Sequence, residues 1–93
     1  RMGRAALDVT RVDMGRVVAE VQCELAGEFP GRRVRWEVGP LPELEGDLMM
    51  LRLAVRNLLA NAVKYTRGRE PAVVEVGCRT GGGAHVFHVR DNG

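Results

Sequence analysis

The stretch from Leu48 to about Tyr65 constrains the fold most, because its apolar residues recur at the three- and four-residue steps of a packed helix. At about 100° per residue, Asn57, Asn61 and Lys64 fall within about 60° of one another, on the side of the helix opposite these apolar residues. Asparagine costs roughly half a kcal/mol against alanine inside a helix, and solvated faces usually carry Glu, Lys and Arg instead. We therefore predict a helix that presents amides and an ammonium opposite a packing face formed by Leu48, Leu51, Val55, Leu58, Leu59 and Ala62.

The first half of the chain predicts one further helix between two strands. Asp13 is a good N-cap, and the apolar spacing that follows it predicts a helix to about Glu28. A short edge strand is expected at residues 10–12, and strict alternation over residues 33–38 predicts a half-buried strand. Gly39-Pro40-Leu41-Pro42 excludes regular structure, and Gly46-Asp47 supplies the next break and the cap of the next helix.

The last third of the sequence predicts an antiparallel hairpin. Residues 72–79 and 85–90 are the two strands, and the three glycines at 81–83 are the turn. No Lys-Ser or Lys-Thr pair follows these glycines, which excludes a P-loop. The order strand, helix, strand, helix, strand, strand predicts a two-layer α/β sandwich, with the helices packed on one face of a mixed sheet.

Length, charge and composition narrow the class of protein. A chain of 93 residues forms at most one domain, and a net charge of +2 is too small to indicate binding to nucleic acid. The apolar runs are too short for a membrane span, so we expect no membrane contact from this segment and a cytoplasmic location. The two cysteines and two histidines lack the spacing of a zinc site.

A carboxylate at the end of the last strand is a candidate binding group. Phe87, Val89 and Asp91 alternate onto one face, which is the face where the helices are expected to pack. Burial of a carboxylate is costly unless it accepts good hydrogen bonds. On its own, however, an Asp before Asn-Gly is most simply a turn residue.

Two motifs resemble those of a known family. The run from Asn57 to Thr66, N-L-L-A-N-A-V-K-Y-T, is similar to the N box of sensor histidine kinases, and Asp91-Asn92-Gly93 looks like the start of their first glycine box. The sequence between them looks most like that of the phytochrome-type kinases. The resemblance extends over about residues 7–93 and implies the Bergerat fold, C-terminally incomplete. Residues 1–9 would be a linker or the tail of a preceding dimerisation domain, and residues 10–93 the N-terminal part of the ATP-binding domain.

The resemblance implies a role for each polar residue of the helix. Asn61 matches a magnesium ligand, while Asn57 and Lys64 match positions that contact phosphates, and Tyr65 matches a residue near the ribose and phosphates. Hydrolytic relatives of the fold carry Glu at the position of Asn57, where it acts as a general base for water. An amide there implies that ATP is preserved for transfer to a protein group.

At the strand end, the resemblance implies that Asp91 accepts a hydrogen bond from the adenine amino group. Guanine would place a carbonyl oxygen at the same edge, which a carboxylate repels. Gly93 would allow close approach of the backbone to the base, because glycine lacks Cβ.

The implied function is that of the ATP-binding domain of a sensor histidine kinase, with ATP and Mg²⁺ as cofactors. The γ-phosphoryl group would pass to a histidine on the dimerisation and phosphoacceptor domain of the same homodimeric protein, with a response regulator downstream. The 93-residue chain alone would be inactive, because it lacks the acceptor histidine. The alternatives are a non-catalytic α/β regulatory module and an anti-sigma-type serine kinase on the same fold.

Overall fold

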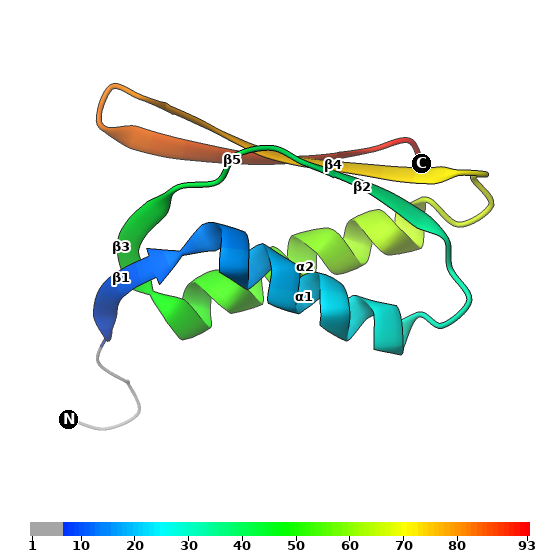
Figure 1. Ribbon diagram of the computed structural model, residues 1–93, viewed down its shortest axis with the longest axis horizontal. Helices are drawn as coiled ribbons and strands as arrows, with labels where there is room; N and C mark the ends of the chain where they lie inside the picture. The colour runs from blue at the N-terminus through cyan, green and yellow to red at the C-terminus, as the bar shows by residue number, and fades with distance from the viewer. Residues whose placement is uncertain (1–6) are drawn as a thin grey trace.

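The computed structural model describes residues 7–93, which form two layers (Figure 1). Both helices lie on the same side of the main sheet (Figure 1). This arrangement confirms the predicted two-layer α/β sandwich. The elements in chain order are β1 (Val9–Asp13), α1 (Met14–Glu28), β2 (Val34–Val38), β3 (Glu43–Asp47), α2 (Leu48–Tyr65), β4 (Ala72–Gly81) and β5 (Ala84–Asp91).

The main sheet is mixed and has the strand order β2-β4-β5. β2 runs parallel to β4, with Val34 opposite Ala72, and β4 pairs antiparallel with β5, with Val74 opposite Asp91. The predicted hairpin is therefore confirmed, and its turn is Gly82-Gly83, two glycines at positive φ. This register places the end of β5 beside the start of β4.

One strand was not predicted. Residues 43–47, for which no strand was expected, form β3, which pairs antiparallel with β1 in a separate two-stranded sheet. The segment E-L-E-G-D lacks the β-branched and aromatic residues that identify strands, so its strand conformation depends on pairing with β1. β1 itself extends one residue beyond the predicted edge strand at each end. Residues 1–6 of the expected linker lie outside the described residues, and Val9 belongs to β1.

Both helices begin at the predicted aspartate caps. Asp13 accepts a hydrogen bond from the backbone N–H of Arg16, and Asp47 accepts one from the N–H of Met50 (3.1 Å). Asp47 also accepts from the N–H of Asp8 (3.0 Å). The hydrogen bonds from Asp8 and then Met50 lower the pKa of the Asp47 carboxyl below its ordinary value of 3.8. Asp47 thus joins the start of α2 to the segment before β1.

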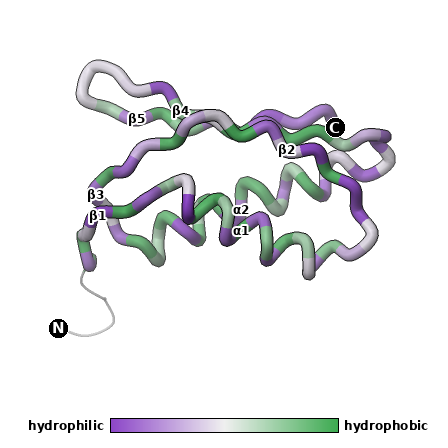
Figure 2. The backbone as a smooth tube through the Cα atoms, in the orientation of Figure 1, coloured by the Kyte–Doolittle hydropathy of each residue, from purple (hydrophilic) through white to green (hydrophobic). Residues whose placement is uncertain are grey.

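The core lies between the helices and the sheet, and in Figure 2 apolar residues recur along α2 and the first half of β4. Its largest cluster joins both helices to β4 through buried aliphatic side chains. This cluster comprises Val18, Val21, Leu25, Leu59, Ala60, Ala62, Val63, Val74 and Val76.

Ion pairs join the two helices on the surface of the helix pair. Arg52 bridges Glu20 (2.6 Å) and Glu24 (2.8 Å), and Arg56 pairs with Glu28. None of the helices in residues 7–93 has the length and apolar character needed to cross a membrane.

The predicted packing face of α2 is only partly correct. Leu59 and Ala62 are buried, and Leu51 and Val55 are half-buried, but Leu48 and Leu58 are 48% and 50% exposed. Leu58 is about 100° around the helix from Leu59, which turns it away from α1 and the sheet. Leu48 is the first residue of α2 and lies beside residues of β1 and α1 that line an open pocket, so about half of its surface stays exposed. The angular positions of these residues around α2 therefore did not predict where the buried face of the helix ends.

Candidate functional site

The polar stripe predicted on α2 is exposed along its whole length. Asn57, Asn61 and Lys64 are all exposed. At a rise of about 1.5 Å per residue they extend over about 10 Å of the helix. Their side chains make no hydrogen bond or ion pair with any other residue in the range 7–93. These amides and this ammonium are therefore free to contact a ligand.

Exposed apolar side chains flank the stripe. Met50, Leu53 and Leu58 are each exposed by half or more, and Tyr65 at the end of the helix is 65% exposed. A wholly solvated helix face would carry charged residues at these positions. The surface thus combines polar groups for orientation with apolar area that a bound molecule could cover.

Asp91 lies at the end of β5 on the face turned toward the helices, as predicted. It is half-buried, like Phe87 and Val89 on the same face. Its Oδ1 accepts a hydrogen bond from the backbone N–H of Gly93 (2.9 Å). Oδ2 makes no hydrogen bond within the described part of the chain, so one carboxylate oxygen remains available as an acceptor.

Gly93 lies against the end of α2. A Cβ on Gly93 would clash with the carbonyl group of Tyr65 and would lie 3.0 Å from the backbone nitrogen of Thr66. Glycine is therefore required here by close contact with the helix, a cause that the sequence did not indicate. The approach of Gly93 to a base stays a prediction. This contact brings the segment after β5 to the last turn of α2, which carries Lys64 and Tyr65.

Asn92 holds this segment in place and was not singled out from the sequence. Its Oδ1 accepts from the N–H of Val73 (2.9 Å), and its Nδ2 donates to the carbonyl of Pro71 (3.0 Å). Its own N–H donates to the carbonyl of Val73 (3.2 Å). Three hydrogen bonds therefore attach the residue between Asp91 and Gly93 to the start of β4.

The end of α2 is capped by a side chain from a distant turn. Arg32 donates through Nη1 to the carbonyl of Val63 (2.7 Å) and through Nη2 to Oγ1 of Thr66 (3.0 Å). Thr66 is fully buried, and its Oγ1 lies 2.9 Å from the carbonyl oxygen of Ala62. A guanidinium is well suited to this place because the carboxyl end of a helix carries partial negative charge. The guanidinium of Arg32 thus holds the turn that follows Tyr65 in place.

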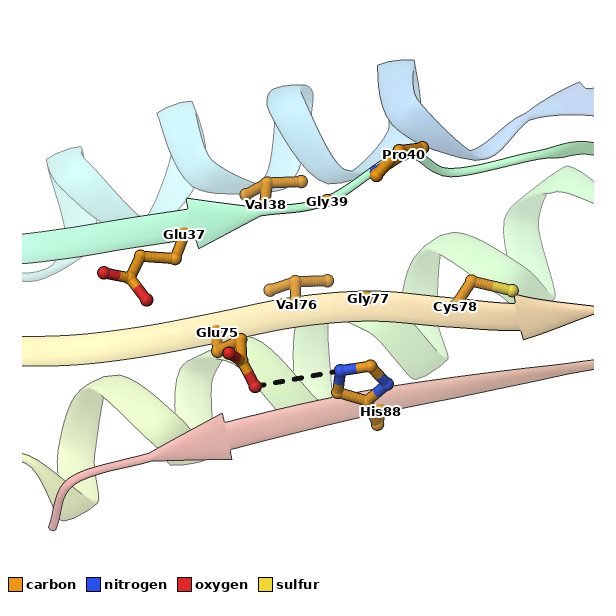
Figure 3. Close-up of a pocket in the computed structure, with 9 residues that line it drawn as sticks. All are labelled: Glu37, Val38, Gly39, Pro40, Glu75, Val76, Gly77, Cys78 and His88. Carbon is orange, nitrogen blue, oxygen red and sulfur yellow. Dashed lines mark ion pairs between the residues drawn. The ribbon is translucent and has the colours of Figure 1, made fainter.

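A separate hollow of about 470 Å³ lies over the outer face of the sheet (Figure 3). Glu37, Glu75 and His88 project into it, away from the helices, and His88 Nε2 lies 3.9 Å from Glu75 Oε1 (Figure 3). Its lining includes none of the residues predicted to bind nucleotide. Within residues 7–93 no three His, Cys, Asp or Glu side chains are grouped to hold a metal ion. This hollow is therefore separate from the predicted nucleotide site.

Comparison with known proteins gives one informative similarity. No family model matches the chain. The methanogenesis regulatory histidine kinase FilI of Methanothrix harundinacea (strain 6Ac) is 33% identical over 94 aligned positions, which include the whole of this chain. The chain spans 11% of the length of that relative. The chain is thus similar to a short region of a histidine kinase.

Proposed function

We propose that residues 10–93 are the first part of the ATP-binding domain of a sensor histidine kinase, in the Bergerat fold. One observation carries the proposal: the exposed stripe of Asn57, Asn61 and Lys64 on α2 ends where Gly93 contacts the helix. The two segments that carry the family-like motifs therefore meet, although β4 and all of β5 before Asp91 lie between them in the sequence. The similarity to FilI supports the assignment to a kinase.

The donor set on α2 fits a magnesium nucleotide. Mg²⁺ usually keeps several waters and takes few protein ligands beside the nucleotide phosphates, so the amide oxygen of Asn61 suffices as the protein ligand. Lys64 supplies a point positive charge for a phosphate, and the amide of Asn57 supplies a donor without a general base. When bound, the nucleotide supplies the phosphoryl group, and these residues orient it for a histidine on the dimerisation domain.

Asp91 is proposed to select adenine through Oδ2. Its other oxygen is occupied by the N–H of Gly93, so Oδ2 is the acceptor left for the adenine amino group. Asp91→Asn is a sharp test because an asparagine Oδ1 still accepts from Gly93, while Nδ2 replaces the free acceptor by a donor.

The test of adenine selection is calorimetric titration of the parent kinase with Mg-ATP and Mg-GTP. We expect the unmodified protein to prefer ATP, and Asp91→Asn to weaken ATP binding by about tenfold or more. Glu43→Gln, which removes an exposed carboxylate on β3, is the control and should leave both affinities unchanged. Equal affinities of the unmodified protein for ATP and GTP would refute the role of Asp91.

The magnesium role is tested by Asn61→Ala in the parent kinase. Removal of a poor helix former should leave the melting temperature unchanged or slightly higher, while Mg-dependent ATP binding and autophosphorylation are lost. Chelation of Mg²⁺ with EDTA should lower the affinity of the unmodified protein for ATP to the affinity of the Asn61→Ala variant. Glu45→Ala, at an exposed position of β3 outside the proposed site, is the control for binding. A folded, unmodified protein that binds no nucleotide at all would instead indicate a non-catalytic module.

A further inference from the structure

Two turns at one end of the molecule enclose a strongly basic hollow. The turn between α1 and β2 and the turn between α2 and β4 lie at the same end of the molecule (Figure 1). Together they line a hollow of about 390 Å³. Its walls carry four arginines, Arg32, Arg33, Arg67 and Arg69, and one acidic residue, Glu70. None of the residues proposed to bind nucleotide belongs to this lining.

Within residues 7–93, three of these arginines have no acidic partner. Arg32 caps α2, but Arg33, Arg67 and Arg69 form no ion pair with any carboxylate of the described chain. Most other described arginines on the surface are paired with a glutamate. Like charges repel when they are gathered in this way, and here no ion pair offsets the repulsion. The paired arginines are Arg11, Arg16, Arg35, Arg52, Arg56 and Arg90.

The backbone of both turns is fixed. Gly31 (φ 80°) and Gly68 (φ 86°) lie in the left-handed region that glycine adopts readily. The N–H of Arg67 donates to the carbonyl of Lys64 (3.2 Å), and the N–H of Arg69 donates to that of Thr66 (3.0 Å). The backbone at Arg67 and Arg69 is therefore held in place beside the hollow, which lowers the entropy lost when these residues bind a common anionic group.

We propose that this hollow docks an acidic segment of a partner protein, with carboxylates forming paired hydrogen bonds to Arg33, Arg67 and Arg69. Guanidinium groups match carboxylates in a planar, two-pronged geometry. The lining has no aromatic ring on which a base could stack and no apolar side chain that could enter a lipid layer. These absences favour a protein partner over a nucleic acid or a membrane. The proposal does not depend on nucleotide binding.

The test is the fluorescence anisotropy of a labelled oligoglutamate peptide titrated with the 93-residue chain. We expect saturable binding that weakens as salt rises, because the contacts are exposed ion pairs. Arg67→Gln with Arg69→Gln should reduce the affinity by about tenfold or more. The control pair, Arg16→Gln with Arg79→Gln, removes the same charge away from the hollow and should reduce it less than about twofold. Circular dichroism would confirm that both double variants fold.

Three results would overturn the proposal. Equal losses of peptide affinity in the two double variants would show that the peptide is attracted to the net charge of the chain and does not dock at the hollow. Tighter binding of a single-stranded oligonucleotide, with the same dependence on Arg67 and Arg69, would assign the hollow to nucleic acid. Tighter binding of phosphatidylserine vesicles would assign it to a membrane surface.

Discussion

Arg32→Met should destabilise the chain without disturbing its apolar contacts. The variant keeps a flexible apolar stem but loses the two guanidinium hydrogen bonds to Val63 and Thr66. Hydrogen bonds with a charged partner contribute about 1.5–3 kcal/mol each, but water can partly replace them at a half-buried site. We therefore expect a loss of about 2 kcal/mol. For a chain of this size, that lowers the melting temperature by roughly 8–16 °C.

Thermal unfolding followed by circular dichroism and by Trp36 fluorescence would measure this loss. Trp36 is the only tryptophan, and it lines a hollow of about 190 Å³ together with Arg32 and Val63, so its emission reports on this region directly. Arg33→Met is the matched control, because Arg33 makes no such bonds, and it should cost less than about 0.5 kcal/mol. Arg32→Lys should lie between the two, since an ammonium lacks the fork that reaches both acceptors. The reasoning fails if Arg32→Met is as stable as the Arg33 control.

Three further predictions concern stability. Leu59→Ala, at a fully buried position, should cost about 2–5 kcal/mol, whereas Leu58→Ala, one residue earlier and half exposed, should cost less than about 1 kcal/mol in denaturant unfolding; similar losses would contradict the burial described. Asn92→Ala should cost about 1 kcal/mol and increase amide exchange at Val73, and an unchanged exchange rate would count against its bridging role. Because the folded-state pKa of Asp47 is lowered, its contribution to stability is present above the unfolded value of about 3.8 and is lost as pH falls through the folded value. The difference in melting temperature between the unmodified chain and Asp47→Asn should therefore shrink below about pH 4, and a constant difference would be inconsistent with this shift.

Local sequence signals were sufficient for most of the fold. The caps Asp13 and Asp47, the helical spacing of α1 and α2, and the glycine turn of the hairpin each depend on residues a few positions apart. The side of α2 that carries Asn57 and Asn61 followed from the same local geometry. The bond from Asp91 to Gly93 is also local, as the turn interpretation of Asp-Asn-Gly had suggested.

The features that were missed depend on residues far apart in the chain. β3 is a strand because β1 lies beside it, and its own composition gives little sign of this. Arg32, in the turn after α1, caps the far end of α2, and Asn92, after β5, bonds to the start of β4. Such partners are known only when the chain has folded. The proposed nucleotide contacts stay predictions, namely those of Asn57, Asn61, Lys64, Tyr65, Asp91 and Gly93.

The strand pairings also determine which parts of the chain come together late during folding. Gly81 and Ala84 are joined by a turn of only two glycines, so the β4–β5 hairpin closes at small entropic cost. The pairing of β2 with β4 must instead close a loop that contains β3 and α2, and the pairing of β1 with β3 must close one that contains α1 and β2. We therefore expect the hairpin and α2 to order first and β2 to join β4 afterwards, so that substitutions in the glycine turn slow folding while those in β1 mainly speed unfolding.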